Sequence, residues 1–132
     1  MKSNGLLSWL PVGALLVFVL YQKGIIFANF ESIDAKQAFV FYEDNNSTFI
    51  DVRENEELVK DGAIAGAIHI PLGSLEENLE KLQAYHDRKL VVFCRSGNRS
   101  VSASRTLSNA GFTTYNLSGG INAWKSQRLA VR

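Results

Sequence analysis

The chain has little cysteine and proline, and it lacks any cluster of metal-ligating side chains. Among its 132 residues are one cysteine, Cys94, two prolines and two histidines. A single cysteine excludes an internal disulfide framework, and no grouping of cysteine with histidine offers a metal site. The net charge is only +1 at pH 7, which argues against a nucleic-acid binder that depends on bulk electrostatic attraction. We therefore expect neither a metal nor a nucleic-acid partner.

Acidic side chains are missing from the last third of the chain. Residues 31–87 hold all thirteen acidic residues and four basic ones, whereas residues 88–132 hold eight basic residues and no acid. One interpretation is purely structural, since the charges of both parts can mix on the folded surface. The other is that the part carrying Cys94 presents a positive mouth to an anion.

An uncharged apolar segment, residues 6–22, lies near the N-terminus. Its seventeen residues, at about 1.5 Å rise each, are at the short end of what crosses a hydrocarbon core. Trp9 and Tyr21 lie near its two ends, as interfacial aromatic residues do. We predict that residues 1–29 form a single-pass transmembrane anchor, so that the protein is located in a membrane. A globular domain over residues 30–132 follows this anchor.

Two other interpretations of the apolar segment stay open. A cleaved signal peptide would place the cleavage near residues 26–28, where the small-residue pattern is poorly matched. An amphipathic or buried helix is the third interpretation. The positive charges on the two sides of the segment nearly balance, so the sequence does not indicate which side of the membrane the domain faces.

Short strands alternate with helical patterns after residue 30. The predicted strands are 48–52, 67–70, 90–93 and 113–117. The predicted helices begin after Asp34, at Arg53, at Ser74 with a capping box to Glu77, at Ser100, and after Gly119–Gly120. This alternation is typical of a mainly parallel sheet covered on both faces, in which ligands bind beyond the carboxyl ends of the strands.

The stretch of residues 89–100 carries the chemistry. Its apolar run, 90–93, is too short for a helix and is predicted to be a buried strand that ends on Cys94. A polar turn containing Gly97 follows, and Ser100 then opens a helical pattern. Backbone amides of such a turn and the helix N-terminus converge on an anion and favour a thiolate. A structural cysteine would have apolar neighbours on both sides, so we predict a reactive thiol.

Charged and titratable neighbours of Cys94 have different expected roles. The guanidinium groups of Arg95 and Arg99 favour the ionised thiol. His69 lies inside a short apolar strand and His86 in a charged turn, which is typical of structural or solvated histidines. We therefore do not expect a Cys–His dyad of the protease kind.

Five short motifs follow one another between residues 33 and 124. They are Asp51-Val52-Arg53-Glu54 with Glu57, Gly66-Ala67-Ile68-His69-Ile70-Pro71, Val91 to Ser100, Ala110-Gly111-Phe112, and Asn116 to Gly120 with Ala123-Trp124. Together and in this order they resemble the rhodanese family, as a membrane-tethered single-domain member. The resemblance implies an α/β rhodanese-like parallel sheet with helices on both faces. The one N-terminal hydrophobic helix that we predict ahead of this domain lies outside the resemblance.

The resemblance also implies sulfurtransferase chemistry. Cys94 is then the catalytic nucleophile, which attacks the outer sulfur of thiosulfate, releases sulfite and carries a persulfide without a separate cofactor. The persulfide passes to cyanide, a small thiol or a protein thiol. The residues implied to bind the donor are Arg95, Ser96, Gly97, Asn98, Arg99 and Ser100. Asp51 and Arg53 are implied to support the loop through polar contacts beneath it.

Two alternatives to a catalytic sulfurtransferase remain. Cysteine-dependent phosphatases and arsenate reductases place five residues between the cysteine and an arginine. In this chain only four residues lie between Cys94 and Arg99, and the position of the phosphatase arginine is occupied by Ser100. The shorter loop suits a sulfane sulfur better than a tetrahedral oxyanion. The other alternative is a membrane-tethered persulfide carrier or binding module without efficient turnover.

Overall fold

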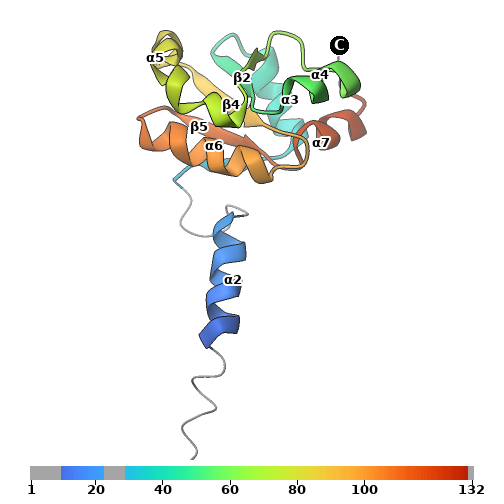
Figure 1. The fold of residues 1–132 in the computed structure, drawn as a ribbon. Coiled ribbons are helices and arrows are strands. Elements are labelled where there is room, and N and C mark those ends of the chain that lie inside the picture. The colour runs from blue at the N-terminus through green and yellow to red at the C-terminus, as the bar shows by residue number, and fades with distance from the viewer. Residues whose placement is uncertain (1–9, 23–28, 131–132) are drawn as a thin grey trace, which may run out of the picture.

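The computed structural model of the chain describes residues 10–22 and 29–130. Five parallel strands form one sheet (Figure 1), in the spatial order β1 (Glu31–Ile33), β5 (Thr114–Leu117), β4 (Lys89–Phe93), β2 (Ser47–Asp51) and β3 (Ile68–His69). The predicted parallel α/β architecture is confirmed. The edge strand β1 was not predicted, because its three residues are too few for a period-2 pattern to stand out.

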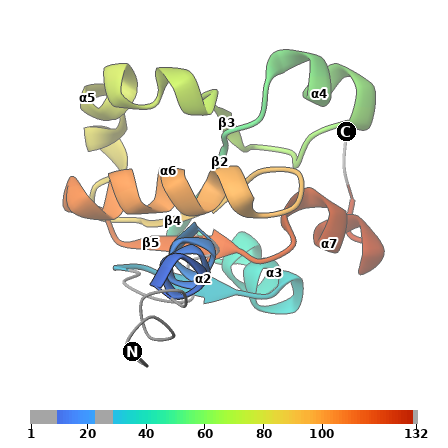
Figure 2. The same ribbon diagram turned by 60° about the horizontal axis from the view of Figure 1, so that its bottom comes forward.

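Helices cover both faces of the sheet (Figure 2). One face carries α3 (Ala35–Glu43) and α7 (Gly120–Ser126), and the other carries α5 (Leu79–Leu82) and α6 (Asn98–Asn109). A further helix, α4 (Asn55–Asp61), follows the carboxyl end of β2 and buries none of its residues. The central strand β4 alternates between the two cores, with Val92 on the α6 side and Val91 and Phe93 on the α3 side. β4 therefore delivers the next residue, Cys94, to the carboxyl edge of the sheet.

The position of α7 depends on Trp124. Its side chain is buried, and its ring contacts the rings of Tyr42 and Phe49 at centroid distances of 5.5 and 5.6 Å. The indole N–H donates to the carbonyl of Ala130 at 3.0 Å. Because burial of a tryptophan contributes strongly to packing, this contact holds the first turn of α7 in place at the carboxyl edge.

The start of α3 agrees with the sequence prediction, whereas α4 begins at Asn55, two residues after the predicted Arg53, and no helix begins at Ser74. Asp34 caps α3 by accepting a hydrogen bond from the Gln37 amide at 2.8 Å, as predicted. The predicted capping box between Ser74 and Glu77 is wrong. Short 3₁₀ turns at Leu72–Ser74, Glu76–Asn78 and Gln83–Tyr85 surround the single turn of α5. These tight turns allow Leu75 and Leu82, both 1% exposed, to reach the same core.

The N-terminal segment contains a helix, α2 (Leu10–Gln22), but the prediction of a transmembrane anchor is wrong. Its 13 residues extend for only about 20 Å, whereas a hydrocarbon core is about 30 Å thick. No helix within residues 10–22 and 29–130 combines the length and apolar content needed to cross a membrane. This contradicts the expected single-pass localisation through residues 6–22. Residues 6–9 and the alternative cleavage site at 26–28 lie outside the described residues.

Candidate active site

Cys94 leaves β4 and opens the tight turn that leads into α6. Gly97 ends this turn with a φ of 116°, a conformation that disfavours any side chain, and serves as the N-cap of α6. α6 therefore begins at Asn98, two residues before the predicted start at Ser100. The Gly97 amide donates to the Cys94 sulfur at 3.1 Å. The sulfur is thus held inside a small ring of backbone at a helix N-terminus.

Ser100 closes this ring from the first turn of α6. The Cys94 thiol donates to the Ser100 hydroxyl oxygen at 3.5 Å, and that hydroxyl donates to the Gly97 carbonyl at 3.1 Å. Both Ser100 and Gly97 are buried, and Cys94 is 1% exposed. When the thiol loses its proton, the Ser100 hydroxyl can rotate to donate to the sulfur instead.

The environment of Cys94 favours the thiolate. Burial on its own raises the pKa of the Cys94 thiol, but hydrogen bonds from the Ser100 side chain and from the amides of Ser100, Gly97 and Ser96 outweigh it. The pKa of Cys94 is consequently lowered from its ordinary value of 9.0. Since the thiolate is the nucleophilic form, this arrangement increases the reactivity of the sulfur near neutral pH.

The first turn of α7 holds the cysteine loop from outside. The amide of Ile121 donates to the carbonyl of Cys94 at 2.9 Å, and the amide of Asn122 donates to the carbonyl of Arg95 at 3.2 Å. A Cβ atom on Gly120 would lie 2.3 Å from the Cys94 carbonyl oxygen, so only glycine fits there. Sequence reasoning treated the Gly119–Gly120 pair as a turn and did not predict this contact with the loop.

Arg99 points to α4 and pairs with a carboxylate there. Its Nη1 and Nη2 atoms donate to the two carboxylate oxygens of Glu57 at 2.6 and 2.7 Å. The hydrogen bond with Arg99, against a smaller opposing effect of burial, lowers the pKa of Glu57 from 4.5 to about 2. Glu57 was recognised in the sequence as part of a motif, but it was assigned no role.

Asp51 and Arg53 form a buried ion pair at the carboxyl end of β2. Their shortest contact, Arg53 Nη2 to Asp51 Oδ2, is 2.7 Å, and Arg53 and Asp51 are 0% and 1% exposed. Arg53 Nη2 also donates to the carbonyl of Gly62 at 2.8 Å, and His69 Nε2 contacts the carbonyl of Arg53 at 2.7 Å. These bonds tie the segments after β2 and β3 together beside the cysteine loop.

The remaining loop side chains face solvent. Arg95, Ser96 and Asn98 are exposed, and Ser96 contributes to the ring around the sulfur through its backbone amide. His86, the second histidine, is about half exposed, with its Nδ1 atom 3.8 Å from Asp87.

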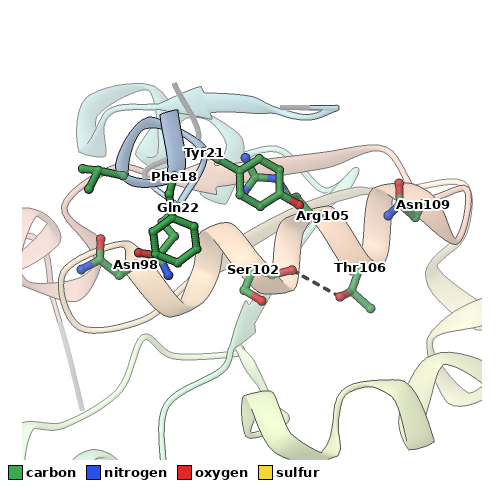
Figure 3. Close-up of a pocket in the computed structure, with 9 residues that line it drawn as sticks. Phe18, Tyr21, Gln22, Asn98, Ser102, Arg105, Thr106 and Asn109 are labelled. Carbon is green, nitrogen blue, oxygen red and sulfur yellow. Dashed lines mark hydrogen bonds between the residues drawn. The ribbon is translucent and has the colours of Figure 1, made fainter. Parts of the chain in front are cut away.

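A cavity of about 610 Å³ lies between α2 and the solvent side of α6 (Figure 3). It is lined by Phe18, Val19, Tyr21, Gln22, Asn98, Ser102, Arg105, Thr106 and Asn109. The Tyr21 ring stacks on the Arg105 guanidinium, with Cζ 3.6 Å from the ring centroid. Cys94 does not line this cavity, which shares only Asn98 with the cysteine loop.

A parallel α/β sheet that delivers a cysteine into a tight loop before a helix defines a class of proteins with an activated thiol. Within this class, the match to a known family is specific, because residues 31–127 match the Rhodanese-like domain. The chain therefore belongs to the rhodanese-like family.

The relatives of the chain include sulfurtransferases and a sulfur carrier. The putative sulfurtransferase YtwF of Bacillus subtilis is 42% identical over 84 residues, which are 64% of this chain and 79% of YtwF. The putative sulfur carrier protein YrkF of the same organism is 37% identical over 82 residues, 61% of this chain but only 43% of YrkF.

Solved structures similar to this chain also include a sulfur transferase and a rhodanese-related protein. The polysulfide-sulfur transferase homodimer of Wolinella succinogenes superposes with a TM-score of 0.75 at 29% identity, covering 91% of this chain and 88% of that one. A rhodanese-related protein of Thermoplasma volcanium superposes with a TM-score of 0.71 at 35% identity, covering 78% of this chain and 98% of that one. The chain is thus a rhodanese-like protein with sulfurtransferase relatives.

Proposed function

We propose that the protein is a sulfurtransferase that carries sulfane sulfur as a persulfide on Cys94. Its donor is thiosulfate or a similar small anion, and its acceptor is cyanide, a small thiol or a protein thiol. The observation that carries the proposal is the position of the Cys94 sulfur, 3.1 Å from the Gly97 amide inside a ring that lowers its pKa. No cofactor is needed, because the cysteine itself holds the transferred atom.

The proposed reaction has two displacements at sulfur. In the first, the Cys94 thiolate attacks the outer sulfur of thiosulfate, a new S–S bond forms, and sulfite leaves with the electron pair of the old S–S bond. In the second, the acceptor nucleophile attacks the terminal sulfur of the persulfide, and Cys94 leaves as a thiolate. With cyanide the product is thiocyanate, and with a thiolate it is a new persulfide. No net proton or electron is gained by the protein over the cycle.

The loop residues have distinct roles in this proposal. The amides of Ser96, Gly97 and Ser100, which stabilise the thiolate, would also stabilise the negative terminal sulfur of the persulfide. Arg95 is exposed at the rim and Arg99 lies on the first turn of α6, so both can counter the charge of an approaching anion. Asp51 and Arg53 support the segments beside the loop and do not enter the chemistry.

A second candidate is a persulfide carrier that delivers sulfur to one partner without efficient turnover. It is favoured by the similarity to the putative sulfur carrier protein YrkF and by the 1% exposure of Cys94, which limits access by free acceptors. Both candidates use the same persulfide, so they differ in the second displacement only.

Two measurements on the parent protein and on Cys94→Ser test these candidates. Thiocyanate formation from thiosulfate and cyanide should be sustained in the parent and fall to the uncatalysed background in the variant. Intact mass after exposure to thiosulfate should show one added sulfur atom on the parent and none on Cys94→Ser. Sulfur loading without turnover would favour the carrier. Absence of loading, or turnover that survives in Cys94→Ser, would refute both.

A further inference from the structure

The Arg99 side chain is held by a carboxylate that is itself fixed at two points. Glu57 is the third residue of α4, and its Oε2 atom accepts the Glu54 amide at 2.8 Å as half of a capping box. The same carboxylate accepts both terminal nitrogens of Arg99 at 2.6 and 2.7 Å. A bidentate arginine–carboxylate pair fixes the plane of the guanidinium as well as its position.

Arg99 interacts both with Glu57 and with the reactive sulfur. The pKa of Arg99 is raised, and the largest cause is its hydrogen bond to Glu57, which outweighs the lowering effect of burial. The charges of Glu57 and of ionised Cys94 raise this pKa further. Its side chain is 35% exposed, compared with 25% for Glu57, so the pair lies at the surface of the molecule and not in the core. An arginine at such a place without a fixed partner would sample many rotamers in solvent.

The Arg99–Glu57 pair belongs to a series of charges of alternating sign that includes the buried Arg53–Asp51 pair. Arg53, which is fully buried, pairs with Asp51 and helps to keep the pKa of Glu57 low through its positive charge. The order is therefore Asp51, Arg53, Glu57, Arg99 and the Cys94 thiolate, each flanked by opposite charge. Glu57 is the member that joins the buried pair at the sheet to the residue next to the sulfur.

We propose that Glu57 is a positioning residue that holds the Arg99 guanidinium at the mouth of the Cys94 loop, where it attracts the anionic donor. The inference rests on the proposed function only for the identity of the donor. The pull of a fixed guanidinium on an anion near Cys94 can be measured without any sulfur transfer.

The test compares the rates at which Cys94, the only cysteine, is alkylated by iodoacetate and by the uncharged iodoacetamide. Both reagents need the thiolate, so their rate ratio cancels changes in the pKa of Cys94. Glu57→Ala and Glu57→Gln remove a negative charge, which on its own would raise the iodoacetate to iodoacetamide ratio, so a fall in this ratio can come only from displacement of Arg99. We expect a net fall of about threefold. Glu57→Gln retains a capping-box side chain at this helix position, so it removes the ion pair with the least disturbance of α4.

Two further variants make the test specific. Glu56→Ala removes the same charge from the exposed neighbour on α4 and should leave the ratio unchanged. Arg99→Gln should lower the ratio as Glu57→Ala does, and the double variant should be no lower than Arg99→Gln alone, because Glu57 acts through Arg99.

Several outcomes would contradict the positioning role. A ratio that stays constant in Glu57→Ala while both rates and the melting temperature fall would assign Glu57 a structural role only. Failure of iodoacetate, but not of iodoacetamide, to react with the parent would show that the mouth of the loop does not admit an anion. By contrast, a ratio that shifts as expected in a protein without thiosulfate activity would support Glu57 as a positioning residue while refuting the proposed donor.

Discussion

The N-terminus of α6 and the solvent side of α6 differ in the contacts that they make. At its N-terminus, the Cys94 loop is held by α7 through two backbone hydrogen bonds and by α4 through the Arg99–Glu57 pair. Along its solvent side, α6 meets α2 through the stacking of Tyr21 on Arg105, and every described residue of α2 is exposed or half-buried (Figure 3). The 610 Å³ cavity lies at the second place, but the convergent amides and the buried sulfur lie at the first.

This difference shows that the chemistry of α6 depends on its end and not on its side. Only at a helix N-terminus do several backbone N–H groups point in one direction without intrahelical partners. The side of the helix offers the hydroxyl groups of Ser102 and Thr106 and the Arg105 guanidinium, which stacks on Tyr21, but no set of converging amides. Four predictions test this contrast.

The largest effect is expected from Gly120→Ala, which would break the contact between α7 and the loop. The new Cβ would lie 2.3 Å from the Cys94 carbonyl oxygen at a φ of 57°, so the loop or α7 must move. We expect a loss of about 1–3 kcal/mol in the free energy of unfolding and a large loss of Cys94 alkylation rate. The measurements are urea unfolding and iodoacetamide kinetics.

Gly66→Ala is the matched control for this variant. Gly66 also has a positive φ, 81°, but a Cβ atom added there would meet no other atom within 4 Å. The control should therefore lose stability through backbone strain while the Cys94 loop keeps its reactivity. Equal loss of reactivity in both variants would mean that the α7 contact has no special role.

Ser100→Ala should raise the pKa of Cys94. The Ser100 side chain is the largest of the hydrogen-bonding effects that lower this pKa against burial, and alanine removes it. The rate of iodoacetamide labelling rises with pH and levels off above the pKa, so the midpoint of this curve should move to higher pH. Ser104→Ala, one turn further along α6 at an equally buried position, should leave the midpoint in place.

Glu57→Gln should make stability depend less on pH. The pKa of Glu57 is lowered from 4.5 to about 2 in the folded protein, so its ionised form stabilises the fold fully above pH 4.5. That contribution is lost as the pH falls from 4.5 toward 2. Urea midpoints should therefore be lower in the variant at pH 7 and approach those of the parent at pH 3. A difference that persists unchanged at acid pH would exclude the ion pair as its cause.

The smallest effect is expected from Tyr21→Ala at the α2–α6 contact. Tyr21 is 42% exposed, and an exposed cation–π pair contributes only about 0.5–1 kcal/mol. Hydrogen exchange of the α2 amides should become faster, while thiocyanate formation and Cys94 labelling stay at the parental level. A marked loss of activity would show that the side of α6 contributes to the site after all.

Much of the sheet could be predicted, because each central strand carries its own signal. The apolar run at Leu90–Phe93 and the predicted strand at Thr48–Val52 correspond to β4 and β2 with shifts of one residue. The predicted strand over 67–70 is shorter in the structure, where β3 covers Ile68–His69, although the Ile70 amide still donates to the carbonyl of Asp51 on β2 at 2.9 Å. Boundaries were harder because caps depend on side chains that several polar residues can supply.

The transmembrane prediction failed for a different reason. Hydropathy describes how apolar a segment is, but the length of the helix decides whether it can cross a membrane. The described helix α2 covers only 13 of the seventeen residues counted in the sequence. Length was thus the deciding quantity, and it was not contained in the composition of the segment.

The sequence by itself determined the strand–loop–helix unit around Cys94, because strand propensity, the polar turn and Gly97 all act between neighbours in the chain. The tertiary structure decided what surrounds that unit. Gly120 meets the Cys94 carbonyl only because α7 is anchored by Trp124 under the sheet, and Glu57 meets Arg99 only because α4 and α6 converge at one edge. Such contacts join residues about 25 to 42 positions apart, and no local pattern records which partner will be near.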